Sequence, residues 1–197
     1  MTSTRQPTAR HQSAATREPA TPVRDNFRLP LLVFLLTGCA VALALGVYAA
    51  EHRPSGYSLN IVGFSSPLYV KAWLTTAATV LAVVQLLTAG RMYDAAPSSR
   101  VHAVHRWSGR VAVLLTVPVA VHCLYALGFQ GGSPRVLLHS LLGCFLYGAF
   151  VVKMLVLTRS PRPRWVVPVA GGALFTGVIG LWLTSSLWVF TTTGLHL

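Results

Sequence analysis

Two histidines lie in apolar sequence on either side of a short turn, where a metal or a cofactor could be bound. The stretch is VHCLYALGFQGGSPRVLLHSLLG, and it holds His122 and His139 with no carboxylate nearby in sequence. Ionisable side chains at membrane depth are energetically costly and therefore point to function. Neutral imidazole is a good ligand for haem iron, and a low-polarity site between helices suits such a cofactor. These histidines are the first candidates for a functional site.

The depths of the two histidines match if the flanking segments are membrane helices. At 1.5 Å per residue, His122 lies about 10 Å before Phe129, and His139 lies about 6 Å after Arg135. A short connection joins the two segments, so we expect them to be neighbouring antiparallel helices. Imidazoles at similar depth on neighbouring helices can approach one iron from opposite sides. We therefore predict that His122 and His139 are the axial ligands of one haem b.

Three nearby residues fit haem better than a bare metal ion. Arg135 precedes His139 by one helical turn, on the same face and nearer water, where a haem propionate needs a cation. Gly143 follows His139 by one turn and leaves space for a flat macrocycle. Tyr125 stands one turn outward of His122 and can supply a hydrogen bond. Zinc or copper would usually call for a third or fourth nearby ligand.

A plainer alternative is that the two histidines only bond hydroxyl groups on neighbouring helices, such as those of Thr116 and Ser140. The remaining histidines are sorted by location. His11 lies in the N-terminal segment, while His52 and His196 lie near the outer surface, and we expect all three to be solvated.

A polar group is expected where the third apolar segment begins. His105, Arg106 and Ser108 could form an inner-face site for a quinone, a haem propionate, a lipid head group or a partner protein. A helix start with basic residues at the interface is an equal alternative. A second haem would need another ligand pair near this face, and Met154 is the candidate partner for His105.

The amino-acid composition indicates whether these residues lie in water or in a membrane. The chain has 197 residues, of which 53% are hydrophobic and only 10% are charged, whereas a soluble domain carries roughly 25% charged residues. Charge-free runs long enough to cross a bilayer recur along the chain. The sequence predicts an all-α integral membrane bundle of five transmembrane helices, at roughly 29–50, 68–89, 108–129, 135–158 and 166–190.

The charge distribution predicts the topology. Lys and Arg number 16 against 4 Asp and Glu, and 13 of these basic residues lie on one side of the predicted helices. This asymmetry follows the positive-inside rule, so the charge sets orientation and does not indicate nucleic-acid binding. We expect the N-terminus inside and the C-terminus outside a bacterial-type cell membrane. Residues 1–28 are expected to be a disordered basic cytoplasmic tail, and residues 29–197 the membrane domain.

Short motifs resemble a known class of membrane cytochromes. HSLLG (His139–Gly143), preceded by HRWSGR and HCLY, resembles the histidine-containing helices of transmembrane b-type cytochromes of the cytochrome b561 and ferric-reductase kind. The resemblance covers roughly residues 100–158. It implies a helical bundle that holds haem between histidines, with His122 and His139 as axial ligands. Those proteins typically use four histidines for two haems, whereas this chain has one good pair.

A second likeness concerns the inner face. HRWSG (His105–Gly109) is similar to the His-Arg-x-Ser/Thr-Gly signature of succinate dehydrogenase membrane-anchor subunits, where it lies near quinone and haem. The whole architecture also resembles an uncharacterised family of small bacterial five-helix membrane proteins, which implies no activity.

Two classes of function remain open. The first is a haem-b-binding oxidoreductase or electron-transfer subunit that carries electrons, with quinone or a redox protein as partner and an acceptor at the outer face. The second is a cofactor-free membrane scaffold or assembly subunit. The four acids, Glu18, Asp25, Glu51 and Asp94, all fall in the tail or in predicted loops. An acid-based proton-coupled transporter is therefore disfavoured.

Overall fold

The computed structural model describes residues 27–58, 63–93 and 98–196. All regular structure in these ranges is helical. The elements are α1 (Arg28–Glu51), α2 (Pro67–Arg91), α3 (Ser99–His122), a π-helical turn η1 (Cys123–Leu127), α4 (Pro134–Leu157), α5 (Val166–Thr184) and α6 (Ser186–Thr193). The tail predicted at 1–28 lies outside the described residues apart from its last two positions.

Five helical segments in the described ranges are long and apolar enough to span a membrane, namely Arg28–Glu51, Pro67–Arg91, Ser99–Leu127, Pro134–Leu157 and Val166–Thr193. The predicted all-α architecture with five such helices is confirmed to this extent. Large apolar side chains, including Leu36, Leu43 and Val47 on α1, are exposed along the bundle. Acyl chains of a bilayer would cover this surface, as expected of a multi-pass membrane protein.

Helix α3 begins at Ser99, well before the predicted residue 108. Ser98 is its N-cap, and its hydroxyl accepts a hydrogen bond from the Val101 backbone N–H at 3.4 Å. Serine suits this position because its side chain satisfies one of the first helical N–H groups. The prediction followed the apolar run and so omitted the polar first turns. His102 and His105 consequently lie within the helix.

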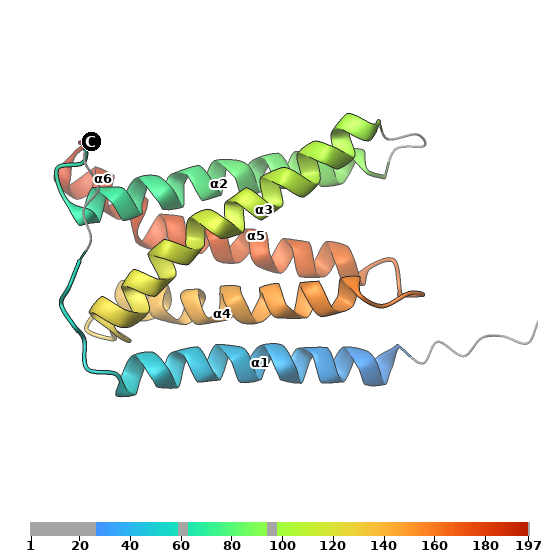
Figure 1. The fold of residues 1–197 in the computed structure, drawn as a ribbon, viewed down its shortest axis with the longest axis horizontal. Coiled ribbons are helices and arrows are strands. Elements are labelled where there is room, and N and C mark those ends of the chain that lie inside the picture. Colours follow the sequence, from blue (N-terminus) through green and yellow to red (C-terminus); the bar gives the residue numbers. More distant parts are fainter. Residues whose placement is uncertain (1–26, 59–62, 94–97, 197) are drawn as a thin grey trace, which may run out of the picture.

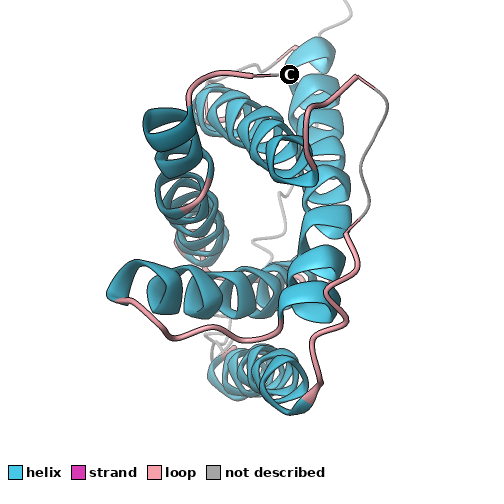
Figure 2. Cartoon of the chain, turned by 90° about the vertical axis from the view of Figure 1, so that its left-hand side faces the viewer, coloured by secondary structure: helices cyan, strands magenta, loops and turns pink. Residues whose placement is uncertain are grey.

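The helices follow one another around the bundle in the order α1, α4, α5, α2 and α3, as their packing contacts show. Figure 2 shows this arrangement end-on. We call the end at which α2 and α4 begin the outer end, following the predicted topology, and the opposite end the inner end. Helix α3 crosses the bundle obliquely, from beside α2 at the inner end towards the end of α1 at the outer end (Figure 1).

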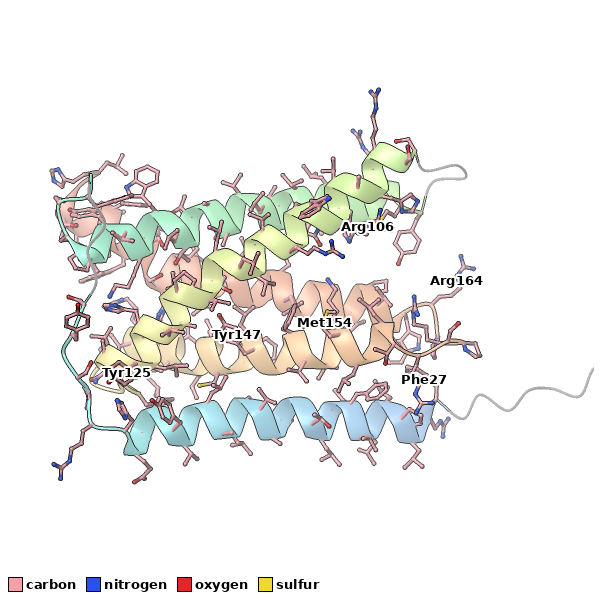
Figure 3. The ribbon with its side chains drawn as sticks, viewed as in Figure 1. Phe27, Arg106, Tyr125, Tyr147, Met154 and Arg164 are labelled. Atoms are coloured by element: carbon pink, nitrogen blue, oxygen red, sulfur yellow. The ribbon has the colours of Figure 1, made fainter. Side chains whose placement is uncertain are left out.

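The predicted packing of the third and fourth helices against each other is wrong for most of their length. In the described ranges α3 packs chiefly on α2, while α4 packs between α1 and α5. The short connection brings α3 and α4 together only at the outer end, because α3 then diverges across the bundle. A side-chain bond still joins them at mid-depth, where Tyr147 Oη donates to Thr116 Oγ1 at 3.1 Å (Figure 3).

Glycines allow α4 to approach its neighbours closely. A Cβ added at Gly148 would lie 3.1 Å from the Ala42 Cβ and would also press on the Gly38 backbone of α1. On the other side, a Cβ at Gly177 of α5 would lie 3.3 Å from Leu146 Cδ1 of α4. Small residues at such crossings let membrane helices gain van der Waals contact.

The fifth apolar segment is broken near its outer end, where a continuous helix to residue 190 was predicted. Ser185 has φ −121° and ψ −77°, which separates α5 from α6. Tyr69 Oη of α2 donates to Thr193 Oγ1 at 2.9 Å and holds α6 against α2. The break places Thr184, Ser185 and Ser186 at the outer end of the bundle.

Candidate functional site

His139 of α4 is oriented by a threonine of α5. Its Nδ1 lies 3.0 Å from Thr184 Oγ1. The Thr184 hydroxyl has one proton, and its 2.7 Å contact with the Gly180 carbonyl uses it. With that proton on the Gly180 carbonyl, His139 Nδ1–H donates to Thr184, and Nε2 is the nitrogen with a free lone pair. A ligand histidine is normally held in this way, by a hydrogen bond through its other nitrogen.

His139 lines a cavity of about 170 Å³ at the outer end, which we call the outer cavity. Side chains from α2, α3, η1, α4, α5 and α6 surround it. Most of its wall is apolar, with contributions from Leu68, Val119 and Val136. Its polar side chains include those of Lys71, Arg135, His139, Thr184, Ser185 and Ser186.

Arg135 is brought next to His139, as its position one turn earlier on α4 predicted. Its Nη1 donates to the Thr184 carbonyl at 2.5 Å, and its guanidinium carbon lies 4.0 Å from the centre of the Trp188 ring. Thr184 therefore binds Arg135 through its backbone and His139 through its hydroxyl. Arg135 keeps donors free towards the outer cavity, because a guanidinium has five N–H groups.

Two further polar residues of the cavity were not singled out from the sequence. Lys71 is half-buried on α2, its ammonium group makes no hydrogen bond or ion pair with a described residue, and its charge acts on both His122 and His139. Ser186 is fully buried, and its Oγ has no partner in the described structure. Lys71 was counted only as an outer charge for topology, although an isolated lysine within an apolar helix was a usable signal. No sequence signal marked Ser186.

His122 is the last residue of α3, followed directly by the π-helical turn. The Gly128 N–H bonds the Cys123 carbonyl five residues earlier, at 2.9 Å, and such π turns occur often at functional sites. The imidazole of His122 is half-buried and makes no hydrogen bond with a described residue. It does not line the outer cavity, although Val119 and Cys123 on either side of it do. Its pairing with His139 on one iron stays a prediction.

The hydroxyl groups considered as alternative partners for the histidines are engaged elsewhere. Thr116 accepts from Tyr147, as described above. Ser140 Oγ donates to the Gln130 carbonyl at 3.0 Å and accepts from the Gln130 N–H at 3.3 Å. The general idea of a histidine bonded to a helix hydroxyl still applies to His139, with Thr184 as the partner.

Tyr125 lies apart from the outer cavity. Its ring stacks on His52, with the ring centres 4.9 Å apart, and His52 stacks in turn on Tyr48 at 5.1 Å. Figure 3 shows Tyr125 at the outer end near α1. The expectation that His52 is simply solvated is wrong, because it is half-buried and its Nε2 is buried without a partner in the described structure. The return of the chain after α1 causes this stacking.

Gly143 has open space beside it, as predicted. A Cβ added there would meet no atom within 4 Å, although the residue itself is half-buried. Gly143 lies one turn deeper than His139 on the same face of α4. Gly143 itself is not among the residues that line the outer cavity.

At the inner end, His105 is held in the same manner as His139. Its Nδ1 lies 2.9 Å from Thr88 Oγ1 of α2, and Thr88 donates to the Val84 carbonyl at 2.7 Å. The same proton count leaves His105 Nε2 with a free lone pair. Lys153 of α4, the residue before Met154, acts electrostatically on His105.

The predicted inner trio is brought together only in part. Ser108 is buried and accepts a hydrogen bond from Gln85 Nε2 at 2.9 Å, and the same Gln85 amide donates to the His105 carbonyl. Arg106 is exposed on α3 (Figure 3), and its guanidinium group makes no hydrogen bond with a described residue. Consecutive helical residues point about 100° apart, so Arg106 cannot share the face of His105.

The five membrane-length helices in the described ranges define an all-α, multi-pass membrane protein. Residues 31–197 match the model of a family of unknown function, DUF6529, and the chain belongs to that family. No curated protein and no solved structure matches it.

Proposed function

We propose that this protein binds haem b and transfers electrons through the membrane domain, with His139 and His122 as axial ligands. The observation that carries the proposal is the imidazole of His139. Thr184 fixes its Nδ1–H, and its Nε2 is left free in the wall of a mostly apolar cavity. That combination is what an iron-binding histidine requires.

The residues around His139 fit the group. Gly143 leaves open space on the same helix face, and Arg135 stands one turn outward with free N–H donors for a propionate. The unpartnered Ser186 hydroxyl adds a buried donor in the same wall. Haem b supplies reversible one-electron chemistry at its iron when it is bound. The chain supplies orientation through Thr184, a cation through Arg135, and apolar walls that exclude water.

The separation of α3 and α4 is compatible with two ligands on these helices. Directly packed helices have axes about 8–10 Å apart, which leaves no room for a macrocycle between two imidazoles. In the described ranges α3 and α4 do not pack closely along their length. His122 has no hydrogen-bond partner there and is available as the second ligand.

The direction of electron flow follows from the proposed topology, with the N-terminus inside a bacterial-type cell membrane and the C-terminus outside. His105 at the inner end has a free Nε2 that can accept a proton from a quinol hydroxyl. A quinone there, and an acceptor or redox protein at the outer end, would make the protein an oxidoreductase or an electron-transfer subunit. The proposal concerns one haem, and a second haem at His105 with Met154 as its partner stays a prediction.

A cofactor-free scaffold is the second candidate, and the threonine contacts also favour it. His139 and His105 each bond a threonine on a neighbouring helix and could serve only to hold helices together. Such interhelical bonds contribute about 0.6–2 kcal/mol each to stability. On this alternative, replacing either histidine would lower the stability modestly and would leave the absorption spectrum unchanged.

The test is a set of three variants purified in detergent after expression with ample haem. His139→Ala and His122→Ala should each lose or severely alter a low-spin haem spectrum. His105→Ala, at the other end of the bundle, should keep it and serves as the matched control. A wild-type spectrum in His122→Ala would remove the bis-histidine assignment, and a wild-type spectrum in His139→Ala would remove the site.

A further inference from the structure

Two cations line the outer cavity, and no carboxylate of the described residues lines it. Lys71 enters from α2 and Arg135 from α4. The acid within the described ranges is Glu51, which is exposed at the end of α1. Lys71 lies about 6 Å from the first residue of α2, and its half-buried side chain lines the outer cavity. A cation that is partly withdrawn from water is stabilised by an anionic partner.

Ser186 provides an independent observation at the same place. Its side chain is fully buried, and its Oγ has no hydrogen-bond partner in the described structure. The two hydroxyls before it are satisfied, since Thr184 donates to the Gly180 carbonyl and Ser185 donates to the Leu181 carbonyl at 2.6 Å. Buried hydroxyl groups are normally bonded, so the Ser186 hydroxyl, on a residue that lines the outer cavity, is available to donate to an acceptor there.

The donors define the chemistry of that acceptor. Lys71 offers ammonium protons, Ser186 offers a hydroxyl proton, and Arg135 offers the guanidinium N–H groups that Thr184 does not use. Cations and a hydroxyl donor together suit an anion. The remaining wall is mostly apolar, which suits an anion carried on an apolar body.

We propose that the outer cavity binds the carboxylate of an otherwise apolar organic acid, with Lys71 and Ser186 as its donors and Arg135 beside them. Two sources can supply this chemistry. One is a propionate of the haem proposed above, in which case the inference rests on that function. The other is a free organic acid that enters from the outer end.

The first arm of the test uses protein purified with haem and measures its reduction potential. Lys71→Met and Ser186→Ala should keep the Soret band and lower the potential, because a lost positive charge or donor disfavours the reduced form with its extra electron. Lys71→Arg should restore most of the wild-type value. Unchanged potentials in both Lys71→Met and Ser186→Ala would overturn the inference and leave the haem proposal standing.

The second arm applies if the purified protein shows no haem band, which would already refute the proposed function. Thermal unfolding is then compared in sodium butyrate and in sodium chloride at equal ionic strength. Butyrate should raise the unfolding temperature of the wild type but not of Lys71→Met or Ser186→Ala. No butyrate-specific rise in the wild type would overturn the inference.

The chain offers a matched control for each substitution. Lys153→Met removes the other lysine, which is half-buried at the inner end, and should behave as the wild type in both arms. Thr191→Val removes a hydroxyl of α6 that does not line the outer cavity and is already bonded to the Leu187 carbonyl of its own helix at 2.9 Å, and it should also behave as the wild type. If Lys71→Met does not fold, Ser186→Ala decides the outcome, because removing an unpartnered hydroxyl breaks no bond in the ligand-free protein.

Discussion

A histidine in a membrane helix can serve as a ligand only when one ring nitrogen keeps its lone pair free and the ring is held in place. Thr184 and Thr88 do this for His139 and His105, each by donating its own proton to a carbonyl of its own helix. A threonine hydroxyl bonded in this way can only accept from the imidazole. The two histidines are thus set in the same tautomer at opposite ends of the bundle.

The orientation by Thr184 leads to a test at this scale. Thr184→Val keeps the shape of the side chain but removes the acceptor for His139 Nδ1–H, and should weaken haem binding about 10–100-fold. A haem titration of the purified protein measures this. Thr192→Val is the control, because the exposed Thr192 hydroxyl bonds carbonyls of its own helix, those of Trp188 at 2.7 Å and Val189 at 3.3 Å. Equal affinities in the two variants would mean that Thr184 does not position a ligand.

The sequence predicted local relations between residues well and distant ones poorly. The spacing of Arg135, His139 and Gly143 on one helix face follows from helical periodicity, and the structure keeps all three together. The partner of His139 is Thr184, 45 residues away, and no periodicity links two helices in that way. The orphan Ser186 depends on the break after α5, which apolar composition does not reveal.

At the scale of elements, the helices were predictable and their pairing was not. Apolar runs located all five membrane-length segments, because a bilayer of about 30 Å requires about 20 apolar residues. The capped polar start of α3 and the break at Ser185 depend on single hydrogen bonds and dihedral angles instead. The pairing of α3 with α2 uses the Gln85 amide and the buried Ser108, which look like ordinary polar residues in the sequence.

The contact between α1 and α4 gives a prediction about packing. Gly148→Ala should lower stability by about 1–3 kcal/mol, because its Cβ would press on the Gly38 backbone and on Ala42. Gly143→Ala is the matched control on the same helix, since its Cβ would meet no atom within 4 Å. Alanine also favours helix over glycine, so the control should be neutral or stabilised in ligand-free protein. Similar unfolding temperatures for the two variants would contradict a tight α1–α4 contact.

At the scale of the whole molecule, the two described ends of the chain lie at opposite ends of the bundle (Figure 1). With 13 of 16 basic residues on the side of the N-terminus, we predict that the C-terminus lies outside. Fusion of the C-terminus to an alkaline phosphatase, which is active only outside the cytoplasm, should give an active reporter. Activity from a reporter that works only in the cytoplasm would reverse the topology and exchange the inner and outer sites.

The most direct test of the haem proposal is one visible absorption spectrum of the whole protein. The wild type is expressed with ample haem, purified in detergent, and measured oxidised and then reduced. We predict a Soret band that shifts on reduction together with a sharp visible band, the signature of a six-coordinate b-type haem. A purified, folded protein without a Soret band would contradict the proposal and leave the cofactor-free scaffold as the function to pursue.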